Sequence, residues 1–279
     1  MTTAPTHHNA PPDFALPDPQ RTMRHYPAAT ASPGFLADSL VVTDPSGWTA
    51  ADDLVSGERI ASLFELPQRL WNTPEHAAAV LAWRFYTYRL AQPLATAWAT
   101  ARELPLLSAD NVLVQLLPAA PYIAVGLRRG TSAVLPTSPA SRAPGAIVLR
   151  DEGAQLDFFR STLIDGHLRP LVERTREIQR VGERMLWGQA AAAIAYAFAD
   201  VSASAMLDTA LFTGALPFPD LAGVGEDETV WRITCCLSFA SPGLTACRDC
   251  VTRKHQRAIK LPNPMARLRR RGESSPGHS

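Results

Sequence analysis

Residues 231–257 read WRITCCLSFASPGLTACRDCVTRKHQR, and this stretch contains all four cysteines of the 279-residue chain. They are Cys235, Cys236, Cys247 and Cys250, with the spacing C-C-x10-C-x2-C. Scattered placement would spread four cysteines along the chain, so their confinement to one short stretch indicates a shared role. Thiolates gather to bind a soft metal, to form disulfides or to carry out redox chemistry. Pro242-Gly243 predicts a turn that folds the two cysteine pairs toward each other.

The spacing by itself leaves three interpretations open. Four thiolates can hold a structural zinc ion in tetrahedral geometry, or they can hold an iron–sulfur cluster. Disulfides or unligated thiols are the third interpretation. Zinc sites usually pair cysteines that are two to four residues apart, and the side chains of adjacent residues diverge in regular structure. The adjacent pair Cys235-Cys236 therefore favours a cluster of two metals over one small ion.

The cysteine pattern resembles that of the FhuF-type siderophore-iron reductases, which use it near the C-terminus to bind a [2Fe-2S] cluster. Trp187-Gly188-Gln189, followed by an alanine-rich stretch, is similar to the family's Trp-Gly-Asn segment, and residues 167–171 (HLRPL) are similar to the segment before it. Gln189 stands where the family more often has Asn, which weakens the expectation of a site role for its side chain. The resemblance covers about residues 50–255.

The resemblance implies a ferric-siderophore reductase with a [2Fe-2S] cofactor held by Cys235, Cys236, Cys247 and Cys250. Its substrate would be a ferric siderophore, for example of the hydroxamate type, and its electron donor a ferredoxin- or flavodoxin-like protein. Oxygen-donor chelators prefer the hard Fe(III) ion over Fe(II), so reduction loosens the iron. The same preference opposes reduction, because each tenfold preference lowers the potential of the iron by about 59 mV.

Positive charge is concentrated around and after the cysteines. Such charge favours the reduced, more negative state of a cluster and attracts an acidic donor protein. Arg248 and Asp249, between Cys247 and Cys250, are closest to the ligands in sequence. The other basic residues near the ligands are Arg232, Arg253, Lys254, His255 and Arg257. An exposed, solvated basic segment is an equally open interpretation.

Composition narrows the remaining possibilities. The net charge of +1 predicts neither nucleic acid nor a membrane surface as a partner. The N-terminus has no basic region followed by an apolar stretch, and the alanine-rich run 190–199 is too short to span a bilayer. These features predict a cytoplasmic protein without a membrane span, where clustered cysteines favour metal or redox use over structural disulfides.

The pattern of the chain predicts an α+β fold that is mainly helical, with a small antiparallel β-sheet in the middle and a C-terminal iron–sulfur binding segment. Residues 1–47 are predicted to be a disordered, proline-rich extension, and residues 261–279 a basic disordered tail. Residues 48–260 form the siderophore reductase-like domain, which includes the cluster-binding segment 231–257.

Within the domain, proline signals set most of the expected helix ends. A short helix is expected to stop at Pro67, and a buried helix from residue 74 to about residue 91 is expected to end or kink at Pro93, before a second helix over 94–103. The longest helix is expected over residues 180–201. The expected strands are 111–117, 122–127 and 146–150.

No other group of residues competes with the cysteines as a catalytic centre. No nucleotide-binding glycine loop, zinc-protease motif or nucleophile elbow is present, and His167 is more typical of a structural or exposed histidine than of a catalytic one. One alternative function is a non-enzymatic zinc module whose basic tail binds an acidic partner or nucleic acid. Another is the related siderophore synthetase class, which needs an ATP site that the sequence does not reveal.

Overall fold

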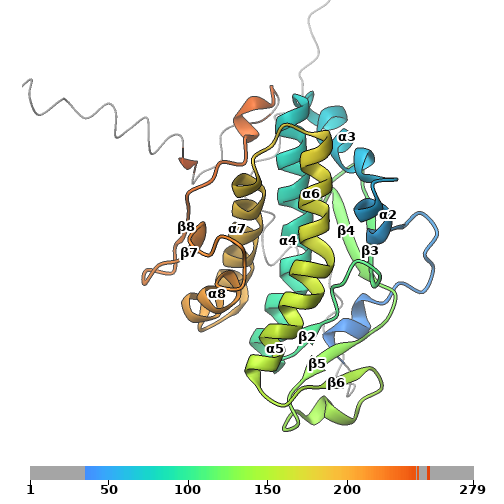
Figure 1. Ribbon diagram of the computed structural model, residues 1–279, viewed down its shortest axis with the longest axis vertical. Helices are drawn as coiled ribbons and strands as arrows, with labels where there is room; N and C mark the ends of the chain where they lie inside the picture. Colours follow the sequence, from blue (N-terminus) through green and yellow to red (C-terminus); the bar gives the residue numbers. More distant parts are fainter. Residues whose placement is uncertain (1–34, 243, 245–249, 252–279) are drawn as a thin grey trace, which may run out of the picture.

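Two long helices form the centre of the molecule in the computed structural model, which describes residues 35–242, 244, 250 and 251. They are α4 (Glu75–Ala101) and α7 (Glu183–Val201), and they make the most extensive contact between any two of the described elements. Both helices run in the same direction. The helical segment from α5 to α6, which lies between them in the sequence, runs in the opposite direction (Figure 1). The other helices are α2 (Ala51–Ser56), α3 (Ile60–Trp71), α5 (Glu152–Phe159), α6 (Arg169–Ile178) and α8 (Ala205–Thr213).

α4 is one continuous helix, so the prediction that Pro93 separates two helices was wrong. A proline inside a helix costs about 3 kcal/mol, because it removes one backbone hydrogen bond and its ring crowds the preceding turn. Leu90, Leu94 and Trp98 lie on both sides of Pro93 and are all buried in the same core. This packing outweighs the local cost. The expected stop at Pro67 was wrong for the same reason, since α3 continues through it, and α4 rather than the 180–201 segment is the longest helix.

The strands form three small sheets. β1 (Thr49–Ala50), β3 (Val112–Leu116) and β4 (Ile123–Leu127) make an antiparallel sheet in the order β1-β3-β4, which confirms the first two predicted strands. The third, β6 (Ala146–Val148), lies in a different sheet, where it pairs in parallel with β5 (Ser132–Val134). β2 (Leu104–Pro105) completes that sheet, and β7 (Ala222–Val224) pairs with β8 (Val230–Arg232) in an antiparallel hairpin. The predicted mainly helical α+β class is confirmed.

A π-helical segment, η3 (Arg160–Leu168), joins α5 directly to α6. The chain therefore passes through Gly166 without leaving the helix. His167 lies in this segment and is fully buried. Its Nδ1 is 2.7 Å from the carbonyl oxygen of Leu107, and its Nε2 is 2.6 Å from the hydroxyl of Tyr86. These contacts place His167 among the structural groups of the core.

The described chain begins inside the core. Phe35 and two residues of the 3-10 helix η1 (Leu36–Leu40) are buried against α4 and β4. The packed region thus starts before residue 48, the expected boundary of the domain. The two short 3-10 helices elsewhere are η2 (Pro139–Arg142) and η4 (Ser238–Ala240). Residues 1–34 of the predicted extension 1–47 and the whole of the predicted tail 261–279 lie outside the described residues.

In the part of the chain that the structure describes, no helix combines the length and the apolar composition that crossing a bilayer requires.

Candidate functional site

β8 delivers the adjacent cysteine pair to one side of the helical core. Arg232 is paired with Ala222 of β7, and the amide of Ile233 donates to the carbonyl oxygen of Leu221, so the strand is held up to the residues that precede the pair. After the pair, Leu237 adopts a left-handed backbone conformation with φ 57° and ψ 17°. This conformation turns the chain at once into η4, beside the start of α4.

Three of the four predicted ligands come together. Cys236 and Cys250 are buried and pack against each other, and the half-buried Cys235 packs on both. The fourth, Cys247, lies outside the described residues, as do Arg248 and Asp249. A hydrogen bond with Cys236, together with burial, raises the pKa of the Cys235 thiol. All three described cysteines are free thiols.

A buried arginine of α4 faces the cysteines. Arg84 is 8% exposed, and its Nη1 donates a hydrogen bond to Sγ of Cys236 over 3.0 Å. Arg232, 7% exposed, approaches the same sulfur from the strand side, with its Nη2 at 3.9 Å. Two guanidinium groups thus meet one sulfur in a region that is shielded from water. Such a setting favours negative charge on the sulfur, as in a thiolate that binds a metal.

The Trp187-Gly188-Gln189 segment of α7 fixes the chain just before the cysteine pair. A Cβ at Gly188 would lie only 2.2 Å from Oγ1 of Thr234. A glycine at position 188 is therefore needed for α7 to contact Thr234, which follows β8. The amide of Gln189 donates to Oγ1 of Thr234 over 3.2 Å and to the carbonyl oxygen of Cys235 over 3.1 Å. Gln189 therefore has a positioning role, although its departure from the usual Asn had weakened that expectation.

Arg84 is the site residue that sequence reasoning missed. It lies 152 positions before Cys236 in the chain, and no spacing rule connects them. One sequence signal was available: Arg84 lies in a helix that is apolar on more than one face. A charged side chain in such a helix is expected to be buried. A buried arginine of this kind must have a polar partner, but the sequence does not say which one.

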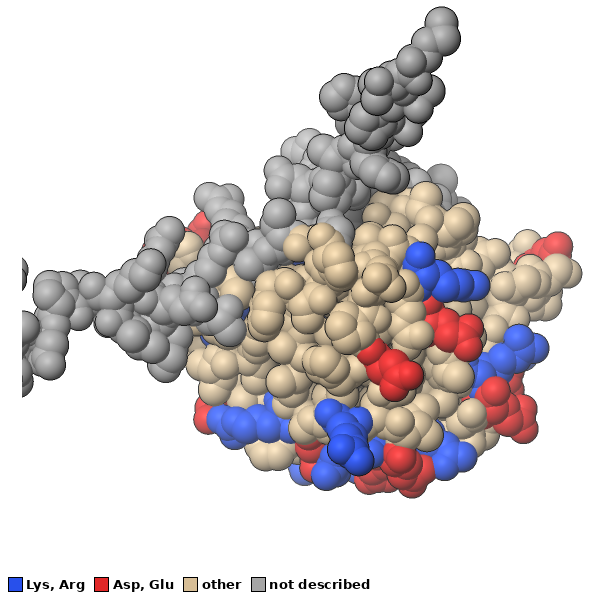
Figure 2. Space-filling model, turned by 90° about the horizontal axis from the view of Figure 1, so that it is seen from above, with Lys and Arg blue, Asp and Glu red and all other residues tan. Residues whose placement is uncertain are grey.

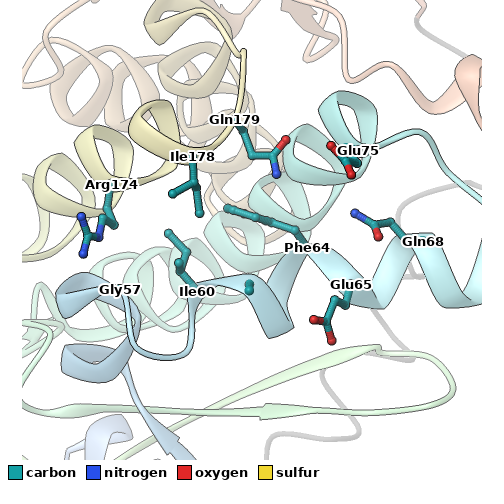
Figure 3. Close-up of a pocket in the computed structure, with 10 residues that line it drawn as sticks. Gly57, Ile60, Phe64, Glu65, Gln68, Glu75, Arg174, Ile178 and Gln179 are labelled. Atoms are coloured by element: carbon teal, nitrogen blue, oxygen red, sulfur yellow. The ribbon is translucent and has the colours of Figure 1, made fainter.

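A pocket of about 470 Å³ lies between α3 and α6 (Figure 3). Ile60, Phe64 and Ile178 converge in it, and polar side chains surround them. These polar side chains belong to Glu65, Gln68, Glu75, Arg174 and Gln179. None of the lining residues is a cysteine, so this pocket is not part of the cysteine site.

Three large apolar side chains close to the cysteine pair in sequence are partly exposed among the described residues. Trp231, Ile233 and Phe239 are 43%, 53% and 50% exposed, and all three lie within four residues of the pair in sequence. On the face seen in Figure 2, charged side chains gather along one edge, and the area beside the grey residues is mostly uncharged.

The donor set fits an iron–sulfur cluster in its chemistry, because it consists of gathered, shielded sulfurs that face positive charge. Within the described ranges, no group of three His, Cys, Asp or Glu residues converges on one point as a single bound ion requires. The ligands of a two-iron cluster are divided between two metals and can lie further apart. The described sulfurs are thus compatible with a cluster, with Cys247 still to be placed.

Comparison with known proteins gives one family. The family model described as "Ferric iron reductase FhuF-like transporter" matches residues 83–223, from the middle of α4 to β7. The matched range includes Arg84 and the Trp187-Gly188-Gln189 segment but ends before Cys235. The match therefore concerns the scaffold and does not include the cysteine motif.

No curated protein matches the chain significantly. Two solved structures of the aerobactin synthetase IucA from a hypervirulent pathotype of Klebsiella pneumoniae, one of them ATP-bound, are similar over 66% of this chain. Their sequence identities are 20% and 18%, and the TM-score is 0.43 for both. The chain spans only 34% and 33% of the length of those two chains.

Proposed function

Because the chain belongs to the family of FhuF-like ferric iron reductases, we propose that it is a ferric-siderophore reductase of the cytoplasm. It reduces the iron of a ferric siderophore, for example one of the hydroxamate type, from Fe(III) to Fe(II). The observation that carries this proposal is the gathering of Cys235, Cys236 and Cys250 beside the buried guanidinium of Arg84. Family membership supports the reaction class, and the three gathered sulfurs support this location for the site.

Cys235, Cys236, Cys247 and Cys250 are the residues that would hold a [2Fe-2S] cofactor. When bound, such a cofactor supplies one electron at a time. The chain's own contribution is to hold the sulfurs and shield them from water. Arg84 and Arg232 offset the negative charge of the thiolates, and Gln189 fixes the backbone of Cys235. Cys236 and Cys250 face the interior, while Cys235 is partly accessible from outside.

The electron balance is simple. A ferredoxin- or flavodoxin-like protein loses one electron, and one Fe(III) ion gains it to become Fe(II). No atom is transferred, so no acid–base residue is needed for the electron step itself. The siderophore releases Fe(II) because its oxygen donors bind the softer ion less tightly. The exposed side chains of Trp231, Ile233 and Phe239 provide a surface on which the donor and the siderophore reach the cysteine site.

The first experiment is to measure the visible spectrum and metal content of protein purified without oxygen, before and after dithionite. Two irons and two sulfides per chain, with absorption that bleaches on reduction and returns on addition of ferrioxamine-type hydroxamate siderophores, are the expected result. Colourless protein that holds one zinc and cannot be reconstituted with iron and sulfide contradicts the proposal and favours a structural zinc module.

Single Cys→Ser variants at positions 235, 236, 247 and 250 then test the ligand set. Each is expected to lose the cluster spectrum and siderophore reduction together, because serine oxygen is a poorer ligand for iron–sulfur clusters than thiolate. A variant that retains a normal spectrum removes its residue from the set. The far-UV circular dichroism spectrum serves as the control, since the helical core contains none of the four cysteines.

A further inference from the structure

We propose that Arg84 is a positioning residue that fixes Sγ of Cys236 and raises the reduction potential of the centre that the cysteines hold. The inference rests on the proposed function and deepens it. It concerns a residue of the helical scaffold that lies far from the cysteine motif in sequence.

The first support is the rigidity of the element that carries Arg84. The residue before it, Trp83, is fully buried and donates from Nε1 to the carbonyl oxygen of Leu186 over 2.7 Å, which ties this turn of α4 to α7. Thr87, one turn later, is also buried and bonds back to the carbonyl oxygen of Trp83. The backbone that carries Arg84 is thus held by packed neighbours on both sides, and the guanidinium reaches Cys236 from a fixed position. Its 3.0 Å contact with Cys236 is therefore a fixed feature of the scaffold.

The second support is the charge of the arginine. A guanidinium stays protonated in proteins, and burying it without compensation costs several kcal/mol. None of the ion pairs among the described residues involves Arg84, and its described side-chain hydrogen bond goes to the sulfur of Cys236. The natural counter-charge is therefore the cysteine site. A thiolate ligand supplies this negative counter-charge, and an electron added to the centre increases it.

The direction of the effect on the potential follows. A cationic N–H donor at a ligand sulfur stabilises the reduced, more negative state more than the oxidised state, so the potential rises. Arg232 acts in the same direction from a longer distance, 3.9 Å, and is expected to have a smaller effect. The C-terminal segment thus supplies the sulfurs of the site, and α4 supplies a positive charge beside them.

Three substitutions separate charge from hydrogen bonding. Arg84→Lys keeps the charge, Arg84→Gln keeps an N–H donor without charge, and Arg84→Met keeps neither. The matched control is Arg89→Met on the same helix, because Arg89 is equally buried but bonds to Gln92 and to the carbonyl oxygen of Pro121. The readouts are the midpoint potential from a spectroscopic redox titration and the melting temperature of each variant.

We expect Arg84→Met to lower the ratio of reduced to oxidised centre at least tenfold at the wild-type midpoint, which corresponds to about 59 mV for one electron. The midpoint potential of Arg84→Gln should lie between those of Arg84→Met and Arg84→Lys. Arg89→Met should keep the wild-type midpoint potential even if its melting temperature falls. If Arg84→Met does not retain the centre, equal midpoints for the Gln and Lys variants overturn the inference.

The two proposals fail in different ways. Wild-type protein that cannot hold a redox centre overturns the proposed function and this inference together. Wild-type protein that is reduced and oxidised normally, with an unchanged midpoint in all Arg84 variants, overturns only the role of Arg84. A shift that is as large in Arg89→Met shows a general effect of losing a buried charge and also overturns it.

Discussion

The helical scaffold and the cysteine segment (residues 230–251) are held in place by different forces. In the scaffold, α4 and α7 bury large apolar side chains such as Trp83, Trp98 and Phe198. In the cysteine segment, the only regular elements among the described residues are β8 and η4, and several large apolar side chains point into solvent. Burial therefore determines the stability of the scaffold, whereas the position of the cysteines depends on a few polar contacts with it.

Those contacts come from the N-terminal halves of α4 and α7 and from Thr73, just before α4. Thr73 and Ser241 share a buried hydrogen bond of 2.8 Å, Gln189 holds the backbone of Cys235, and Arg84 holds the sulfur of Cys236. Each single contact of this type contributes about 0.5–1.5 kcal/mol, or more when a charge takes part. We therefore expect changes in the scaffold to affect folding first, and changes in these contacts to affect the site first.

The largest effect is expected from Trp83→Ala. It removes a fully buried indole and its hydrogen bond to Leu186, so we expect the free energy of unfolding to fall by about 3–5 kcal/mol. Denaturant unfolding followed by circular dichroism measures this change. Trp231→Ala, at a tryptophan that is 43% exposed beside the cysteines, is the control, and an equal loss there would contradict the proposed division between the two regions.

A second effect depends on pH and comes from His167 in the scaffold. Burial lowers the pKa of His167 to about 4 from 6.5, against the opposing influence of Leu107 and Asp110. The carbonyl of Leu107 accepts from Nδ1, so the neutral ring accepts the Tyr86 hydroxyl at Nε2, and burial raises the pKa of that phenol. The neutral ring is the form that the folded state holds.

Because the folded-state pKa is below the unfolded value, this stability is complete above pH 6.5 and is lost as the pH falls toward 4. We expect a loss of about 3 kcal/mol in the free energy of unfolding across this window. His167→Gln should flatten the pH profile, whereas His76→Gln, at an exposed histidine at the start of α4, should leave it unchanged. Identical profiles for both variants would rule out His167 as the cause.

A third effect acts at the boundary between the two regions. In Gly188→Ala, the new Cβ meets the side chain of Thr234, which has to shift, and we expect a cost of about 1–3 kcal/mol from overpacking. Because the strain falls on the residue before Cys235, iron content should fall more than helicity. Adding Thr234→Gly to Gly188→Ala removes the three atoms nearest to the new Cβ and should restore the iron content. A double variant with as little iron as the single variant would place the strain elsewhere.

The smallest effect is expected from Gln189→Ala, which removes two hydrogen bonds to the entry of the cysteine segment. The free energy of unfolding should fall by about 1 kcal/mol. The rate of iron loss to a chelator should increase, because the backbone of Cys235 is less restrained. The control is Gln92→Ala, which removes a hydrogen bond from Arg89 away from the site and should leave the rate of iron loss unchanged.

The sequence predicted those elements whose patterns are local. Short, mainly apolar runs separated by prolines predicted β3 and β4, and the alanine-rich stretch after Trp187 predicted α7 nearly at its true ends. The proline rules failed at Pro67 and Pro93 because they describe the cost to an isolated helix and not the gain from packing on both sides. Likewise, the pattern of 146–150 predicted a strand correctly but could not predict its parallel partner.

For the candidate site, the sequence by itself determined the sulfurs, because the clustering of Cys235, Cys236, Cys247 and Cys250 is visible in the linear chain. Only the tertiary structure decided what faces them. Arg84 reaches Cys236 from another helix, and Gly188 and Gln189 meet the residues before the pair because α7 packs against β8. A local motif fixes which atoms can bind a metal, whereas the charge around them depends on side chains that only the folding of distant segments brings together.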